Sequence, residues 1–172
     1  MRYVMKEKIL TLTDSFTIRD SDGNEVYRVK GKLLSIGDKL SFRDMAGEEL
    51  ALIRQEIITL TPSYRIYRGG ELQADVSKKL LTVFRDKFKV DMKDGSPDLE
   101  IVGNILDHEY SLRRGGREVA HVSKKWISIG DSYGVQVDEG EDDVLILACA
   151  VIVDLISHEP EDRPQPRGKG AS

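Results

Sequence analysis

Most of the chain alternates hydrophobic and polar residues with a period of two, the pattern of half-buried β-strands. The clearest runs cover residues 16–18, 26–29, 40–42, 50–53, 64–66, 88–90, 99–101, 110–112 and 135–137. Turn sequences rich in glycine and aspartate separate them, at residues 21–24, 44–47, 68–71, 94–97 and 114–117. Turns spaced by roughly 8 to 12 residues predict an antiparallel meander.

Residues 144–156 break this pattern, because they are hydrophobic throughout except for Asp154. A bilayer-spanning helix needs about 20 apolar residues, which is more than this segment has. A helix that is apolar on every side must therefore be enclosed by protein. The acidic residues of 138–143 favour a helix start here by capping and by the helix dipole, and we predict a helix to about residue 157.

An internal repeat indicates how the strands are organised. Residues 64–80 match residues 110–126 at an offset of 46, and both copies contain Val-Ser-Lys-Lys. A weaker third copy covers residues 16–33. Repetition of one hairpin-containing unit favours a closed or nearly closed sheet.

These patterns together predict a mainly β fold. The chain holds about twelve strand-like runs, and a barrel of about twelve strands leaves room for a helix about 10 Å wide. We predict a roughly twelve-stranded antiparallel β-barrel that encloses one C-terminal hydrophobic α-helix. The alternative, a helix on one face of an open sheet, would leave a polar helix face, and residues 144–156 have none. The domain is expected to cover residues 1–157, and the proline-rich residues 158–172 are expected to form a disordered tail.

The chain resembles a known family in several segments taken together. They are Lys30-Gly-Lys-Leu-Leu-Ser-Ile-Gly-Asp38, the two Val-Ser-Lys-Lys copies, Leu106-Asp-His-Glu-Tyr110, Trp126 and the C-terminal helix. In these segments it resembles the LURP-one-related (LOR) family of the Tubby C-terminal-like superfamily, which includes the phospholipid scramblases. The resemblance covers about residues 3–157 and implies a twelve-stranded barrel around a hydrophobic helix.

The scramblase resemblance raises the question of a calcium loop before the helix. The acidic end positions of that loop fall on Ile129 and Gly140, so the implied ligand set is broken. Five other acids could offer oxygen ligands to a hard cation: Asp131, Asp138, Glu141, Asp142 and Asp143. We favour helix capping for this segment and predict no metal site and no cofactor.

Composition and charge limit the functional classes to which the protein can belong. The chain has a net charge of −4 and 33% charged residues, which argues against a general nucleic-acid binder. Charges at Arg2 and Lys6 interrupt any signal sequence, so we expect a cytoplasmic protein that is not transmembrane. The single cysteine, Cys149, is expected to be a small buried hydrophobic residue.

Lysines at equivalent corners of the repeats are the candidate binding residues. They are Lys78 and Lys79 in one copy, Lys124 and Lys125 in the next, and Lys30 and Lys32 near the third. A site for anions or lipid headgroups would gain about 1 kcal/mol per basic residue at an anionic surface. The alternative is that edge lysines prevent strand-to-strand aggregation.

No catalytic set can be assembled from the sequence. Asp107, His108 and Glu109 resemble an acid–base cluster, but strand alternation would turn His108 away from its neighbours. The spacing of His121 from the other histidines does not match that of metal ligands. Trp126 is expected in the core. We therefore predict a non-enzymatic binding module, peripheral at membranes through anionic phospholipid headgroups. The alternatives are a protein-interaction scaffold and a scramblase-like, metal-dependent lipid activity.

Overall fold

The computed structural model describes residues 1–7, 15–31, 37, 39–79, 87–128 and 130–157. Within these residues it contains twelve strands and one helix. They are β1 (Arg2–Lys6), β2 (Ser15–Asp20), β3 (Glu25–Gly31), β4 (Lys39–Asp44), β5 (Glu49–Glu56), β6 (Ser63–Arg68), β7 (Glu71–Lys78), β8 (Lys87–Met92), β9 (Leu99–Asn104), β10 (Glu109–Arg114), β11 (Arg117–Ser123), β12 (Ser132–Val137) and α1 (Asp143–Ser157).

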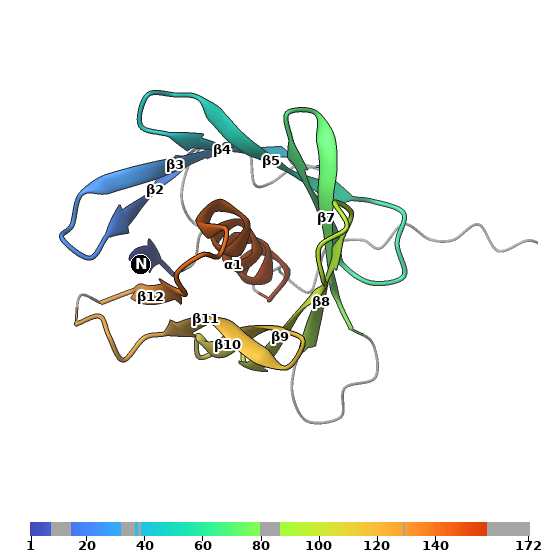
Figure 1. Ribbon diagram of the computed structural model, residues 1–172. Helices are drawn as coiled ribbons and strands as arrows, with labels where there is room; N and C mark the ends of the chain where they lie inside the picture. The colour runs from blue at the N-terminus through green and yellow to red at the C-terminus, as the bar shows by residue number, and fades with distance from the viewer. Residues whose placement is uncertain (8–14, 32–36, 38, 80–86, 129, 158–172) are drawn as a thin grey trace, which may run out of the picture.

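The strands form a closed antiparallel barrel with α1 inside it (Figure 1). Each strand pairs with its neighbours in sequence, and β1 closes the barrel by pairing with both β2 and β12. The predicted fold, a twelve-stranded antiparallel barrel around a C-terminal helix, is confirmed. The expected tail, residues 158–172, lies outside the described residues.

Period-two alternation places one set of side chains inside the barrel, where they meet the helix. Phe42, Ile53 and Ile66 on three neighbouring strands are fully buried in this way. Every residue of α1 from Leu145 to Ile156 is buried too, so the helix has no exposed face along that length. No helix among the described residues is long and apolar enough to cross a membrane.

The middle of α1 carries the small side chains of Ala148, Cys149 and Ala150, all fully buried. Cys149 is buried as expected, and burial raises the pKa of its thiol to about 12. The helix packs against β5, β6, β7 and β12.

Antiparallel pairing gives the barrel two different ends. The hairpin end holds the turns β2–β3, β4–β5, β6–β7, β8–β9 and β10–β11, together with the start of α1. The basic end holds the β5–β6 and β9–β10 connections and the end of α1, and the lysine corners lie there: Lys30, Lys78, Lys79, Lys124 and Lys125.

Arginines of the two clear repeats hold the start of the helix at the hairpin end. Asp142 caps α1, since its carboxylate accepts the N–H of Leu145 at 3.1 Å. Arg68 donates two bonds to the same carboxylate, at 2.6 and 2.7 Å. Arg114, the equivalent of Arg68 in the next repeat, donates to Glu141. The acidic segment therefore caps and anchors the helix, and the capping interpretation is confirmed.

Candidate functional site

The lysine corners do not converge on one site. Lys30 lies near the end of β3, Lys78 ends β7, and Lys124 directly follows β11. In the barrel order these three strands are each separated by four positions. The corners are therefore distributed evenly around the basic end, and Lys32 lies outside the described residues.

Ion pairs are seen at Lys79 and Lys124. Lys79 Nζ lies 3.0 Å from Glu100 Oε1, and this bond lowers the pKa of the Glu100 carboxyl. Lys124 Nζ lies 2.8 Å from Glu7 Oε1. Lys30 and Lys125 are exposed, whereas Lys78 and Lys79 are half-buried.

Exposed aliphatic side chains lie between the lysine corners. Ile58 and Leu60 in the β5–β6 connection are 95% and 97% exposed, and Ile57 beside them is 49% exposed. Leu106 in the β9–β10 turn is 60% exposed. The β5–β6 connection lies between the corners of β3 and β7, and the β9–β10 turn lies between those of β7 and β11. Exposed aliphatic groups thus lie in two of the three intervals between the lysine corners.

Several of the acids considered as cation ligands are already bound by other side chains of the protein. Asp142 and Glu141 bind the two arginines, and Asp143 accepts a hydrogen bond from the Tyr3 hydroxyl. In the part of the chain that the structure describes, no group of three or more His, Cys, Asp and Glu side chains could hold a metal ion.

His108 belongs to the interior of the barrel. It lies in the β9–β10 turn with a φ of 50°, and its Nε2 is 3.0 Å from Oδ1 of Asp154 in α1. The Tyr133 hydroxyl donates to the other carboxylate oxygen of Asp154. Burial raises the pKa of the Tyr133 hydroxyl well above its ordinary value. The buried carboxylate of Asp154 is thus held by partners from the β9–β10 turn and from β12, which is a structural role.

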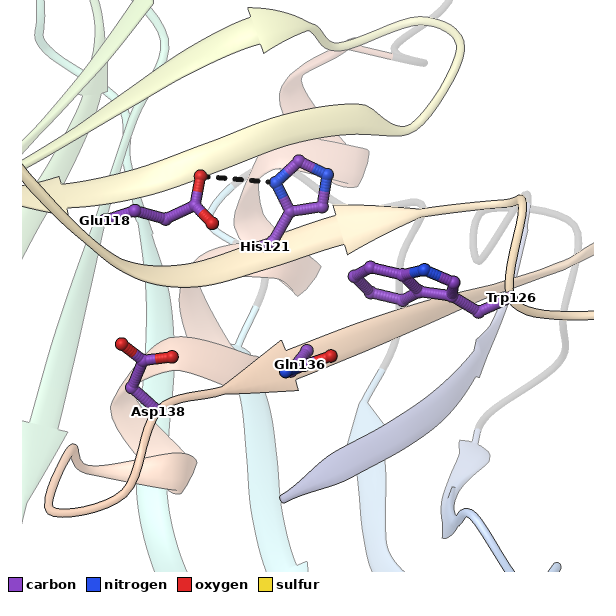
Figure 2. A pocket seen from close by; sticks show the side chains of 5 residues that line it. All are labelled: Glu118, His121, Trp126, Gln136 and Asp138. Atoms are coloured by element: carbon purple, nitrogen blue, oxygen red, sulfur yellow. Dashed lines mark hydrogen bonds and ion pairs between the residues drawn. The ribbon is translucent and has the colours of Figure 1, made fainter.

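A hollow of about 300 Å³ lies on the outer face of β11 and β12 (Figure 2). Its walls come from Glu118 and His121 of β11, Gln136 of β12, and Asp138 and Trp126 beside these strands. His121 and Gln136 are direct cross-strand partners, so both side chains stand on the outer face.

Trp126 lies over a glycine on the outside of the barrel. A Cβ added to Gly134 would meet Trp126 Cε3 at 3.0 Å, which shows how closely the indole rests on this strand. The guanidinium carbon of Arg2 lies 4.6 Å from the ring centroid, and the His121 ring centroid lies 5.4 Å away. The expectation that Trp126 belongs to the core is therefore wrong, because Gly134 makes room for the ring outside the sheet.

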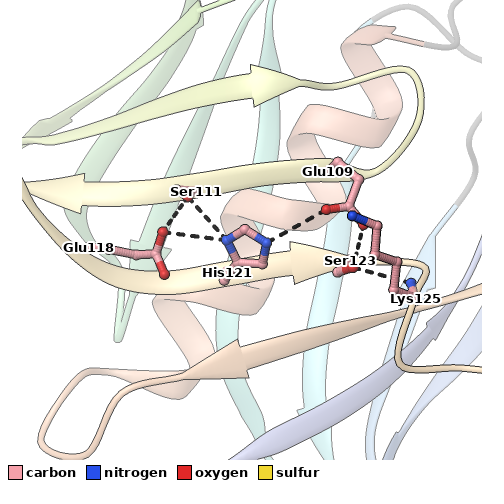
Figure 3. Close-up of polar contacts among 6 residues, drawn as sticks. All are labelled: Glu109, Ser111, Glu118, His121, Ser123 and Lys125. Carbon is pink, nitrogen blue, oxygen red and sulfur yellow. Dashed lines mark hydrogen bonds and ion pairs between the residues drawn. The ribbon is translucent and has the colours of Figure 1, made fainter.

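A polar cluster borders the hollow on β10 and β11 (Figure 3). The Ser111 hydroxyl donates to Glu118 and lies 3.1 Å from His121 Nδ1. His121 Nε2 lies 3.7 Å from Glu109 Oε2, and Glu109 also accepts a bond from the Ser123 hydroxyl. The bond from Ser111 lowers the pKa of the Glu118 carboxyl.

A β-bulge brings Glu118 and His121 to the same face. Residues three apart on a regular strand point to opposite faces. Here Leu112 pairs with Ala120 while Arg113 pairs with Glu118, so Val119 is the extra residue. Bulges re-aim side chains in this way, and strand alternation read from the sequence could not place Glu118 beside His121.

Ser111 is poorly placed to act as a nucleophile. Its hydroxyl donates to Glu118, and its oxygen lies 3.1 Å from His121 Nδ1. Ser111 is also only 8% exposed. The cluster fixes the His121 ring at the edge of the hollow.

Comparison with known proteins places this structure among relatives. A family model described as LURP-one-related matches residues 1–154. The "Uncharacterized protein YxjI" of Bacillus subtilis (strain 168) is 35% identical over 158 residues, which cover 92% of this chain and 94% of the relative. The X-ray structure of a protein from Arabidopsis thaliana has a TM-score of 0.60 at 19% identity, covers 88% of each chain, and shows the fold alone.

Proposed function

The chain belongs to the LURP-one-related family, and we propose that it is a non-enzymatic module that binds anionic membrane surfaces through its basic end. The observation that carries the proposal is that exposed aliphatic side chains lie between lysine corners at that end. A cytoplasmic location, predicted from the sequence, agrees with this role and stays a prediction.

Among the described residues, lysines gather at the basic end of the barrel. Besides the lysine corners, Lys6, Lys39 and Lys87 begin or end strands there. The hairpin end carries acidic turns at residues 20–24, 44–49 and 138–143, together with the arginines Arg68, Arg114 and Arg117. A chain with a net negative charge can therefore still turn a positive end toward an anionic bilayer.

The aliphatic residues are expected to supply most of the binding energy. Full burial of one Ile or Leu side chain is worth about 1.5–3 kcal/mol, whereas one lysine near an anionic surface contributes about 1 kcal/mol. Ile58 and Leu60 are almost completely exposed, so both have that area to bury. The lysines would then select anionic lipid and orient the barrel.

Co-sedimentation with vesicles tests the proposal. The protein is expected to bind phosphatidylcholine vesicles that contain phosphatidylserine more strongly than vesicles without it. The double change Ile58→Ser and Leu60→Ser should weaken binding at least about tenfold, since 1.4 kcal/mol corresponds to a factor of ten. Met45→Ser is the matched control, because Met45 is an exposed hydrophobic residue at the hairpin end.

The lysines are tested separately, with one residue changed in each corner. Lys30→Gln, Lys78→Gln and Lys125→Gln together should remove the preference for phosphatidylserine, while Lys93→Gln at the hairpin end should leave it unchanged. If both sets of variants bind like the wild type, the basic end is not a membrane surface. Absence of vesicle binding together with a protein partner lost in the Ile58/Leu60 variant would favour the interaction scaffold.

A further inference from the structure

We propose that the hollow beside Trp126 is a binding site for a small ligand that carries an ammonium group. The site lies on the outer face of β11 and β12 and is independent of membrane binding at the basic end. Comparison of the two clear repeats within this chain, and the charges around the hollow, support it.

The two repeats place equivalent residues on equivalent strands. In one repeat Asp75 of β7 pairs with Asp91 of β8, and in the next His121 of β11 pairs with Gln136 of β12. The same registers make Lys89, which pairs with Ser77, the counterpart of Gly134, which pairs with Ser123. The sister face on β6–β9 is therefore an internal reference for the face that carries the hollow.

Long charged side chains cover the sister face. Arg65 pairs with Asp75 at 3.5 Å, Lys93 pairs with Asp91 at 2.9 Å, and Lys89 pairs with Asp98 at 3.8 Å. Such solvated ion pairs are the ordinary way to cover an outer sheet face.

On the face with the hollow, the corresponding positions have changed together. Arg65 is replaced by Ser111 and Lys89 by Gly134, so two long side chains are lost from the same patch. Trp126 covers the glycine instead, with His121 held beside it by the polar cluster. A barrel surface that only needs covering does not require this exchange. The result is a hollow with an aromatic wall and fixed polar groups, the usual composition of a small-ligand site.

The charges around the hollow favour a cation. Glu118 and Asp138 both line it, and the hydrogen bond from Ser111 lowers the pKa of the Glu118 carboxyl. Arg2 already lies over the Trp126 ring, so the ammonium group of a ligand would bind at the carboxylates of Glu118 and Asp138. Arg2 itself donates to Gln136 at 2.9 Å and lines a second hollow, the one it shares with Met1, Ser21 and Gln136.

Tryptophan fluorescence can report binding directly, because Trp126 is the single tryptophan of the chain. The wild-type protein is titrated at constant ionic strength with n-butylammonium and with 1,5-diaminopentane. 1-Butanol and butyrate serve as neutral and anionic probes of similar size. We expect a saturable change of emission with the amines alone. No saturable change with either amine, or the same change with butanol, would overturn the proposal.

Charge-neutral variants of equal size locate the binding group. Glu118→Gln and Asp138→Asn should each weaken amine binding about tenfold, as expected for a lost charge-assisted hydrogen bond. Asp91→Asn removes the same charge from the sister face and should change nothing. Equal weakening in all three variants would show a nonspecific charge effect and reject the site. Asp138 is exposed, so this variant keeps the test valid if Glu118→Gln perturbs folding.

A peptide probe identifies the source of the ammonium group. Acetyl-Gly-Lys-Gly-amide carries the same group on a lysine side chain. Tighter binding of this peptide than of free amines would show that the site takes a basic protein segment, and tighter binding of the amines would show a metabolite site. Vesicle binding should be unchanged by Asp138→Asn, so failure of this site and failure of membrane binding are distinguishable.

Discussion

Enlarging a small residue in the middle of α1 should destabilise the protein, because the helix is enclosed on every side. Ala148 and Ala150 are both fully buried, as are the residues between and beside them. A leucine adds three carbon atoms to each alanine position. Since no side of this helix segment faces solvent, the added atoms cannot move outward and must displace the inner side chains of the barrel.

The expected effect follows from the density of a filled core. Inserting methylene groups into well-packed surroundings costs about 1–3 kcal/mol. For a domain of this size, 1 kcal/mol shifts the melting temperature by about 2–4 °C. Ala148→Leu and Ala150→Leu should therefore each lower the melting temperature by roughly 2–12 °C.

Thermal unfolding followed by far-UV circular dichroism measures the melting temperature, and urea unfolding followed by Trp126 emission measures the free energy of unfolding. Ala46→Leu is the matched control, because Ala46 is exposed in the β4–β5 turn. The control should stay within about 0.5 kcal/mol of the wild type. If both core variants did the same, the space around α1 would not be filled and the reasoning from complete burial would be refuted.

Three other predictions concern the start of the helix, the polar cluster and the Cys149 thiol. Arg68→Leu should lower the free energy of unfolding by about 1–2 kcal/mol, because the Asp142 carboxylate that caps α1 loses two charged donors; urea unfolding measures this, and an unchanged midpoint would contradict it. The bond from Ser111 gives Glu118 a lower pKa in the folded state than its ordinary 4.5, so its contribution to stability is present above that pH and lost as pH falls through the folded value. Unfolding of Glu118→Gln should therefore depend less on pH below about pH 4.5 than that of the wild type, and parallel pH profiles would show that the bond contributes nothing. Burial and a pKa of about 12 should keep Cys149 unreactive toward a thiol reagent at pH 8 until the protein unfolds in urea, and rapid labelling of the native protein would show that the barrel opens.

Local sequence patterns were enough to predict the elements of the fold. Alternation marked most strands, and the pairs Gly69–Gly70 and Gly115–Gly116 marked hairpins, where all four glycines have positive φ. Three strands, β1, β7 and β11, were not among the clearest alternating runs, although the repeats implied the last two. The helix was recognisable because a short segment apolar on all sides can be stable in water only inside protein.

The candidate site was predictable only in part. The signal for the hollow was present in the sequence, because aligning the repeats sets Gly134 against Lys89 and Trp126 against Leu80. The sequence alone did not reveal the hollow, because only the strand register and the packing show that Gly134 lies under the indole. The core assignment of Trp126 failed because composition favours burial of tryptophan without saying on which side of a sheet it is buried.

The sequence by itself therefore determined most of the strands, the turns, the buried helix and the internal repeat, since each depends on residues close together in the chain. Tertiary structure alone decided which of these residues meet. Closure through β1 and β12 spaces the lysine corners four strands apart, and a single bulge at Val119 turns Glu118 toward His121. The physical reason is that pairing between distant strands sets the side of the sheet on which a side chain lies and its position around the barrel. One extra residue in a strand reverses that side.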